Sequence, residues 1–177
     1  MLSRLRSPDR QPLDLEPLLL ELKRMLALRQ DLPHGLTLEV SLDEETPSVL
    51  ADADQLRQIL QNLLANSVDA IRTVFAPRIT CRAERAEDDN PLGMPAVVLR
   101  VEDNGCGIPT ELKERVFTPF FSTKAQGTGL GLSLVDRIVR EHEGLLQLQS
   151  APGVGTTITI LLPAVSQSRT YRRALGA

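Results

Sequence analysis

Residues 53–73 combine a wide apolar face with a narrow polar stripe at helical spacing, and no other feature constrains the fold as strongly. The apolar face consists of Leu56, Ile59, Leu60, Leu63, Leu64 and Ile71. The polar stripe consists of Gln58, Asn62, Asn66, Asp69 and Thr73, spaced three or four residues apart. Such a helix must bury its apolar face. Its stripe is either solvated by water or faces a polar ligand, because an amide oxygen can hold Mg²⁺.

The rest of the chain alternates helical and strand patterns in mixed order. A helix is predicted from Leu15 to about Leu26. Another is indicated by the apolar residues of 132–139 and ends at Gly144. Asp52 is a plausible cap for the helix at residues 53–73. Strands are predicted at 36–42, 78–84, 96–103, 145–150 and 156–162, a short helix at 110–116, and a loop or lid at 117–131. This order predicts an α+β protein, a two-layer α/β sandwich whose mixed sheet is covered on one face by helices.

Length and composition narrow the class of protein. A chain of 177 residues with 42% hydrophobic residues is long enough for one domain with a real core. We expect this domain at residues 13–163, with a flexible leader at 1–12 and a flexible tail at 164–177. The net charge of −3 argues against a nucleic-acid binder, since neutralising phosphates needs a basic surface.

The sequence also bears on the cellular location of the protein and on the role of its two cysteines. No apolar run approaches the roughly 20 residues of a membrane helix, and no signal peptide is evident, so a cytoplasmic location is expected. Cys81 and Cys106 have no metal-site spacing and form no disulfide framework. Each is expected to be a small buried or half-buried side chain.

A second polar feature is the carboxylate of Asp103, at the end of a predicted strand. Val97, Leu99 and Val101 alternate along that strand, so Asp103 shares their buried face. A lone buried carboxylate is costly unless it is hydrogen-bonded, and an adenine amino group would be a suitable donor. Backbone N–H groups of a tight Asn-Gly turn would serve equally well. Gly105 and Gly107 follow, and they would let the backbone approach a flat ring without a Cβ clash.

Two further glycine-rich segments come later in the chain. Residues 127–133 run directly into a helix, and free N–H groups at a helix N-terminus favour phosphate. Thr123 and Lys124 precede this loop within reach of terminal phosphates, although Lys124 could equally be a solvated surface residue. Thr156 begins the last strand, and its hydroxyl either lies near a base and Asp103 or is that of an ordinary strand threonine.

Five motifs in this order resemble those of the Bergerat-fold ATPases and kinases. DQLRQILQNLLANSVDAI is similar to the N box, VEDNGCGIP to the first glycine box, FTPFFSTK to the F box, GTGLGLSLV to the second glycine box and PGVGTTITILLP to the closing glycine segment. They lie within about residues 52–163. The F box and the spelling of the N box resemble sensor histidine kinases, near the nitrogen-regulation type.

The resemblance implies a site for ATP or ADP with Mg²⁺. Asn66 would be the metal ligand and, with Lys124, a catalytic residue, while Asp103 would accept from the adenine amino group. The remaining cofactor-binding residues would be Asn62, Asp69, Gly105, Gly107, Ile108, Thr123, Gly127, Thr128, Gly129, Leu130, Gly131, Leu132 and Thr156. Phe117, Phe120 and Phe121 would anchor the lid without touching ATP.

The family's phosphoacceptor histidine lies on a separate helical dimerisation domain, and neither histidine here has that context. His34 lies in a Pro-His-Gly turn, and His142 lies in the last turn of a predicted helix, where the helix dipole favours a cation. The resemblance therefore implies the catalytic half of a kinase, whose full-length form could be membrane-anchored. Its partners would be a histidine-bearing dimerisation domain of the same or another chain and, indirectly, a response regulator.

Three other activities are compatible with the same fold. ATP-hydrolysing relatives, such as gyrase, mismatch-repair and heat-shock chaperone ATPases, carry a Glu general base at the position of Asn62, and an amide cannot take a proton from water. Serine kinases of the anti-sigma type also tend to carry Glu there and lack the F box. A non-catalytic nucleotide sensor is the third alternative. The intact set of Asn66, Asp103 and the glycines argues against it.

Overall fold

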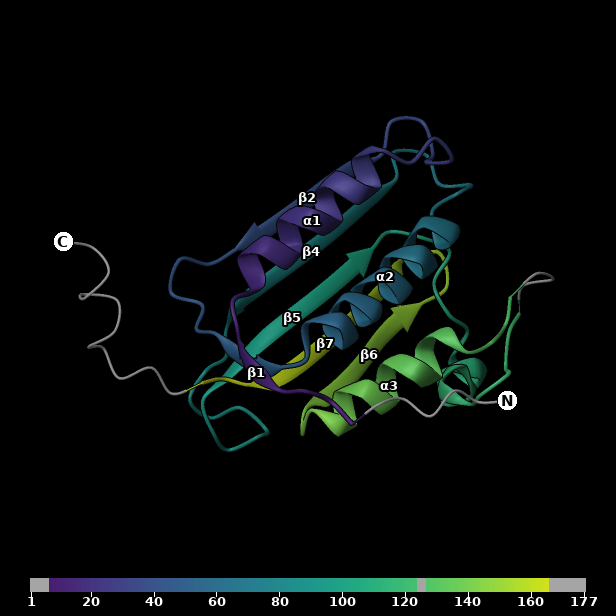
Figure 1. The fold of residues 1–177 in the computed structure, drawn as a ribbon. Coiled ribbons are helices and arrows are strands. Elements are labelled where there is room, and N and C mark those ends of the chain that lie inside the picture. Colours follow the sequence, from purple (N-terminus) through teal and green to yellow (C-terminus); the bar gives the residue numbers. More distant parts are fainter. Residues whose placement is uncertain (1–6, 124–126, 166–177) are drawn as a thin grey trace.

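The computed structural model describes residues 7–123 and 127–165, which form two layers. One layer is a five-stranded sheet in the order β2-β4-β5-β7-β6, and the described residues place three α-helices over one of its faces (Figure 1). The strands are β2 (Thr37–Leu42), β4 (Arg78–Arg85), β5 (Ala96–Asp103), β6 (Leu145–Ala151) and β7 (Gly155–Pro163). β2 pairs with β4 in parallel and the other pairs are antiparallel, so the predicted mixed sheet with one covered face is confirmed.

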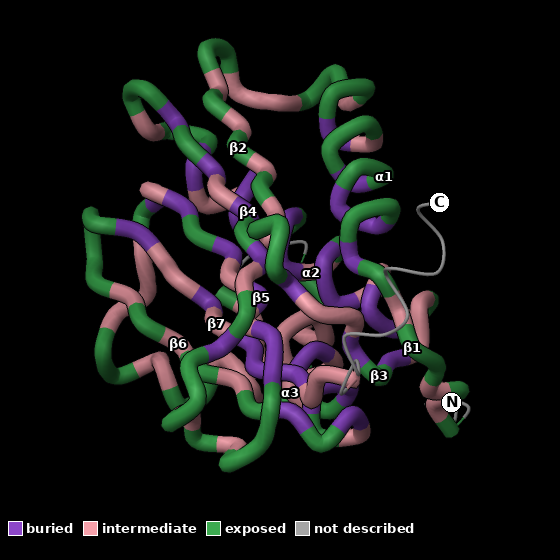
Figure 2. The backbone as a smooth tube through the Cα atoms, turned by 90° about the vertical axis from the view of Figure 1, so that its left-hand side faces the viewer, coloured by how far each residue is buried: buried purple, intermediate pink, exposed green. Residues whose placement is uncertain are grey.

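The three helices lie on the same side of the sheet because each carries one apolar face. They are α1 (Leu15–Ala27), α2 (Ala53–Ala70) and α3 (Gly131–Glu141), and Figure 2 shows them beside the sheet, whose other face carries no helix of the described residues. The apolar face predicted for α2 is fully buried, and its leucines and isoleucines pack with those of α1 and β5 in one aliphatic core. Burial of this face is the main contribution that holds the helix on the sheet.

Side-chain caps begin the first two helices. Asp14 accepts the N–H of Glu16, and Asp52 accepts the N–H groups of Asp54 and Gln55, as expected for Asp52. None of the helices in the described part of the chain combines the length and apolar character that crossing a bilayer requires.

Residues near both ends of the described part of the chain are paired with the region around β3. β1 (Gln11–Leu13) pairs antiparallel with β3 (Val49–Ala51) in a separate two-stranded sheet, so the expectation of a loose leader is wrong at residues 11–12. At the other end, Ala164 forms a bridge with Val49, and the Val165 N–H donates to the Ser48 carbonyl. Pairing with β3, which lies far away in sequence, orders both ends. Residues 1–6 and 166–177 lie outside the described residues.

Two helix boundaries differ from the sequence prediction. The central helix ends at Ala70 with Ile71 as its cap, earlier than the predicted end at residue 73. The short helix predicted at 110–116 is instead two 3₁₀ turns, Thr110–Leu112 and Arg115–Phe117, neither of which has a side-chain cap.

The end of α3 also departs from the expected glycine cap. The left-handed residue is Glu143, with φ 57°, and not Gly144. Gly144 lies so close to β7 that an added Cβ would be 2.5 Å from the Leu161 carbonyl oxygen. Glycine is required there because the end of α3 approaches β7 closely, and the helical pattern could not indicate this.

Replacing Leu60 by Ala is expected to lower the free energy of unfolding by about 2–5 kcal/mol, because Leu60 is fully buried at the centre of α2. Urea denaturation followed by circular dichroism measures the change. Leu28→Ala is the matched control, since Leu28 is 83% exposed, and it should change stability by less than about 0.5 kcal/mol. Equal effects of the two substitutions would contradict the assignment of α2 to the core.

Candidate functional site

A cavity of about 500 Å³ lies between α2, the end of β5 and the loop that leads into α3. Most of the residues proposed from the sequence line it: Asn62, Asn66, Asp69, Asp103, Gly107, Ile108, Thr123, Gly127, Thr128, Gly129, Gly131, Leu132 and Thr156. Gly105 and Leu130 do not line it, and Lys124 lies outside the described residues. The motifs, which are spread over about a hundred residues of sequence, therefore converge on one hollow.

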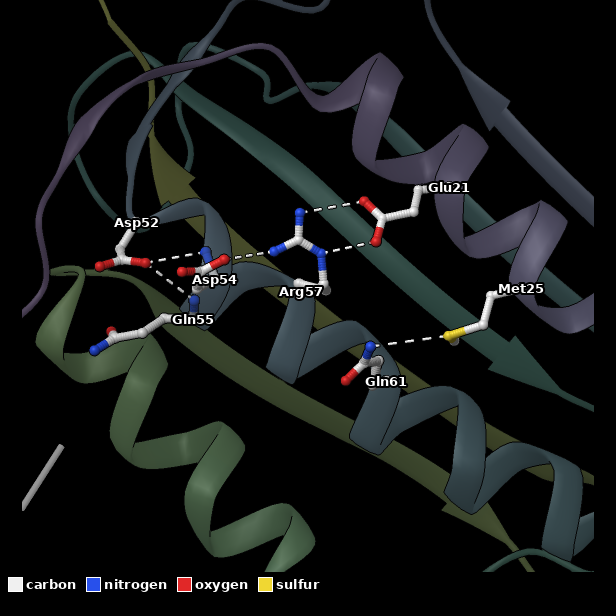
Figure 3. Close-up of polar contacts among 7 residues, drawn as sticks. All are labelled: Glu21, Met25, Asp52, Asp54, Gln55, Arg57 and Gln61. Atoms are coloured by element: carbon white, nitrogen blue, oxygen red, sulfur yellow. Dashed lines mark hydrogen bonds and ion pairs between the residues drawn. The ribbon is translucent and has the colours of Figure 1, made fainter. Parts of the chain in front are cut away.

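The orientation of α2 is reinforced by polar contacts with α1 on the side away from the cavity. The guanidinium of Arg57 donates to both carboxylate oxygens of Glu21, at 2.9 and 3.2 Å, and to Asp54 at 2.6 Å (Figure 3). Gln61 Nε2 lies 3.8 Å from the Met25 sulfur. These groups are partly exposed, so each contact contributes little stability and only adds to the apolar burial that orients α2.

The polar stripe of α2 and the start of α3 meet at one end of the cavity. An added Cβ on Gly131 would lie 3.1 Å from Asn62 Oδ1 and 3.7 Å from Asn66 Nδ2. Asn62 Nδ2 donates to the Gln58 carbonyl at 2.8 Å, which leaves its Oδ1 on the side of Gly131. No side chain among the described residues caps the start of α3. Its first N–H groups and the positive end of its dipole are therefore available to an anion.

The buried carboxylate of Asp103 lies at another wall of the cavity. Asp103 is 7% exposed, accepts from Ser67 Oγ at 2.9 Å through Oδ2, and accepts from the Gly105 N–H at 2.9 Å through Oδ1. Burial raises the pKa of this carboxyl above its ordinary value, although hydrogen bonds from Gly105, Ser67 and the Thr156 backbone oppose the shift. Protein donors satisfy Asp103, including the backbone N–H of Gly105 that the sequence offered as one explanation, and Asp103 also borders the cavity. Its contact with an adenine amino group stays a prediction.

The hydroxyl of Thr156 belongs to a network beside Asp103. Thr156 pairs with Asp103 across β5 and β7, and its Oγ1 lies 2.9 Å from Ser150 Oγ. Ser150 Oγ accepts the Ile108 N–H and donates to the Gly155 carbonyl, each at 2.8 Å. Because the single Ser150 hydroxyl hydrogen goes to Gly155, Thr156 is the donor to Ser150. This network fixes the turn that carries Ile108 against the end of the last two strands.

The glycine at position 105 has a different role from the one expected. An added Cβ there would lie 2.6 Å from Ala70 Cβ and 2.7 Å from Asp103 Oδ1. Protein atoms, not space for a flat ring, therefore require glycine at this position. The absence of a Cβ lets the end of α2 lie directly against the turn after β5, where the Cys106 N–H donates to the Ala70 carbonyl at 3.0 Å.

The F box and the second glycine box contact each other through their backbones. Gly129 has φ 66°, and an added Cβ would lie 2.4 Å from the Phe120 carbonyl carbon, so only glycine fits. The Phe120 N–H donates to the Gly129 carbonyl at 2.9 Å, whereas its ring is 68% exposed and anchors nothing by burial. Phe121 lines the cavity, with the Arg115 guanidinium 4.4 Å from its ring centre. Its role as a lid anchor that does not touch ATP stays a prediction.

Several cavity residues were not identified from the sequence. They are Leu63, Ala65, Ser67, Ala70, Val101, Cys106, Val116, Phe121, Ser122 and Ile158. Ser67 is the most informative of these, because its place directly after Asn66 was a visible signal, but its partner lies 36 residues away. Cys106 is exposed, so the expectation of a buried thiol is wrong there, whereas Cys81 is buried and burial raises the pKa of its thiol to about 12.

Comparison with known proteins shows the family to which the chain is related. Residues 51–166 match the family described as "Histidine kinase-, DNA gyrase B-, and HSP90-like ATPase". The chain is 41% identical over 122 residues to the signal transduction histidine-protein kinase AtoS of Escherichia coli strain K12, covering 69% of this chain and 19% of AtoS. It is 35% identical over 133 residues to the sensory histidine kinase/phosphatase NtrB of Vibrio alginolyticus, covering 73% of this chain and 38% of NtrB.

Among solved structures, the catalytic domain of histidine kinase ThkA superposes with a TM-score of 0.70 at 30% identity, covering 88% of this chain and 96% of that domain. The likeness to nitrogen-regulation kinases inferred from the motifs is thus confirmed at the level of sequence relatives. The chain spans less than two fifths of either curated relative, so it corresponds to one part of their length.

The ligand-free protein should lose stability, relative to Asp103→Asn, as pH rises above about 4. Because burial raises the folded-state pKa of Asp103 above 3.8, the folded protein keeps a proton that the unfolded chain has already released. That contribution to stability is full below the unfolded pKa and disappears as pH rises through the folded pKa. Urea denaturation of both proteins across this range measures it, and a stability difference that is constant with pH would contradict the shift.

Proposed function

Because the chain belongs to the family of histidine kinase-, DNA gyrase B- and HSP90-like ATPases, we propose that it is the ATP-binding catalytic domain of a two-component sensor histidine kinase. One observation carries the proposal: the carboxamides of Asn62 and Asn66 on α2 and the buried carboxylate of Asp103 border the same cavity. This is the combination that a nucleotide with an amino-bearing base and a charged phosphate chain requires.

The two chemically different walls of the cavity orient the nucleotide. Asp103 is an acceptor in an apolar surrounding that includes Val101 and Ile158, so it suits the amino group and the flat face of adenine. Asn62, Asn66 and the N-terminus of α3 at Gly131 offer polar groups and a favourable dipole, so they suit the phosphates. Thr123 lines the cavity and is assigned to the phosphates. Lys124 lies outside the described residues, and its contact with the terminal phosphate remains what the family resemblance implies.

The donor set of α2 fits one Mg²⁺ that the phosphates share. Asn66 would hold the ion through a neutral amide oxygen, and Mg²⁺ commonly takes only one or two protein ligands together with phosphates and water. Asp69 lies almost one turn further along α2 and also borders the cavity. When bound, the ion would neutralise charge on the phosphates. The protein's own contribution is then to hold the phosphate chain at a defined place and exclude water.

Transfer to a protein histidine suits this site better than hydrolysis. An attacking water needs a general base, and the side chain of Asn62 at the position of the family's Glu cannot accept a proton at neutral pH. We expect the acceptor to come from elsewhere, because both ring nitrogens of the buried His142 are engaged and His34 does not line the cavity. The partner is therefore a histidine-bearing dimerisation domain of the same or another chain, and a response regulator would receive the phosphoryl group later.

Asp103→Asn should weaken adenine nucleotides by about ten- to hundredfold, because the charged acceptor for the amino group is lost. Calorimetric titration with ATP measures the affinity, and Asp89→Asn, in the exposed loop between β4 and β5, is the matched control. GTP, which lacks that amino group, should bind poorly to the wild-type protein. Equal ATP affinity of a folded Asp103→Asn protein would remove Asp103 from the adenine site.

Mixed with Mg–ATP and a histidine-bearing dimerisation domain of a related kinase, the chain should form acid-labile phosphate on that domain. Asn66→Ala should reduce the transfer by at least about a hundredfold, whereas Gln58→Ala, on the same stripe but outside the cavity, should retain it. Steady ATP hydrolysis without transfer would favour an ATPase, and phosphate stable to acid would favour a serine kinase. Nucleotide binding with neither reaction would favour a sensor.

A further inference from the structure

His142 is a fully buried polar side chain that the nucleotide site does not use. It caps the C-terminus of α3 and has 0% exposure. Its Nδ1 lies 2.8 Å from the Ile138 carbonyl oxygen, which can only accept, so Nδ1 carries the hydrogen. Its Nε2 accepts the Asp52 N–H at 3.0 Å, so Nε2 carries none. These two partners assign a neutral ring in the Nδ1–H form, whereas the sequence had suggested a site that favours a cation.

Asp52, the partner of His142, is the point where three segments meet. It is the residue before α2, and its Oδ1 caps that helix through the N–H groups of Asp54 and Gln55. Its Oδ2 accepts the N–H of Asp9 at 2.9 Å. The backbone N–H of Asp52 donates to His142, and its carboxylate accepts from the start of α2 and from Asp9. A displacement of any one of these three partners therefore alters the geometry of the contacts with the other two.

The segment before α1 is attached at the same place by two further contacts. Gln11 to Leu13 pair with β3 directly before Asp52. Arg10 NH1 lies 3.0 Å from the carboxylate of Glu143, the left-handed residue that follows His142. Residues 9–13 thus contact both the start of α2 and the end of α3.

Further along their axes from His142, α2 and α3 also border the phosphate side of the cavity. α2 and α3 pack against each other, and Asn62 on α2 faces Gly131 at the start of α3. A contact that holds one end of two packed helices together limits how far they can rotate or slide relative to each other. It therefore also limits the distance between Asn62 and Gly131 further along the helices.

We propose that His142 is a positioning residue for nucleotide binding. Its neutral ring holds the end of α3 against the start of α2, and through Asp52 it couples the attachment of residues 9–13 to the spacing of the two helices at the cavity. This inference rests on the proposed function, since it concerns the same nucleotide. By linkage, the coupling is reciprocal: nucleotide binding strengthens the attachment of residues 9–13.

Two substitutions separate the two hydrogen bonds of the ring. His142→Asn keeps a donor for the Ile138 carbonyl but is too short to accept from Asp52, whereas His142→Gln places an amide oxygen near the former Nε2 position. His142→Asn should raise the Kd for ATP by about three- to tenfold, the effect of one net hydrogen bond, and His142→Gln should restore most of the affinity. His34→Asn, in the exposed turn, is the matched control and should not change the Kd.

Two measurements on the ring and the backbone distinguish positioning from general stability. The ¹H–¹⁵N spectrum of the imidazoles should show the neutral Nδ1–H form for His142, assigned by the loss of the other signal in His34→Asn. Saturating ATP should slow hydrogen exchange at the Asp9 and Asp52 N–H groups of the wild-type protein. In His142→Asn, this response at Asp9 should be lost, although the variant is folded.

The outcomes separate the inference from the proposed function. Wild-type protein that binds no ATP would overturn both. ATP binding with unchanged exchange at Asp9 and Asp52, an Nε2–H ring, or a folded His142→Asn variant with wild-type affinity would overturn only the role of His142. If neither variant folds, the ring form and the exchange response of the wild-type protein decide the matter.

Discussion

The contact between α2 and the end of β5 is the interaction on which the cavity depends. There the Ser67 hydroxyl donates to the Asp103 carboxylate at 2.9 Å, and Gly105 leaves the room that Ala70 occupies. A carboxylate with 7% exposure is tolerated only because protein donors satisfy it. If α2 lay further from the sheet, Asp103 would lose Ser67 as a donor and the cavity would lose one of its walls.

The helix α2 both packs in the core and lines the cavity, because its residues face different directions. Its apolar side enters the core, its outer side binds α1 through Arg57, and its third side borders the cavity with Asn62 and Asn66. Burial of the first side determines the direction of the other two, since a helix is rigid over this length. The stability of the core and the placement of the polar groups are therefore inseparable.

The proposed role of His142 extends this dependence to the far end of the same helices. A neutral ring satisfied on both nitrogens is directional, whereas aliphatic packing is not, so it defines register where packing alone would allow sliding. Its link to residues 9–13 through Asp52 gives the segment before α1 a physical connection to the two helices that border the cavity. The connection consists of ordinary hydrogen bonds and needs no change of fold.

The sequence by itself determined the main helices and strands, the two-layer class and many of the residues that line the cavity. Helical and strand periods are local, so α2 and its stripe, the buried row ending at Asp103 and the glycine segments were readable from short windows. The tertiary structure alone decided which distant groups meet: Ser67 with Asp103, Asp52 with His142, and β1 with β3. It also decided that Gly105 and Gly144 serve packing and not ligand space or a helix cap. The physical reason is that periodicity records which side of an element is buried, whereas a hydrogen bond between elements depends on their mutual placement to within fractions of an ångström.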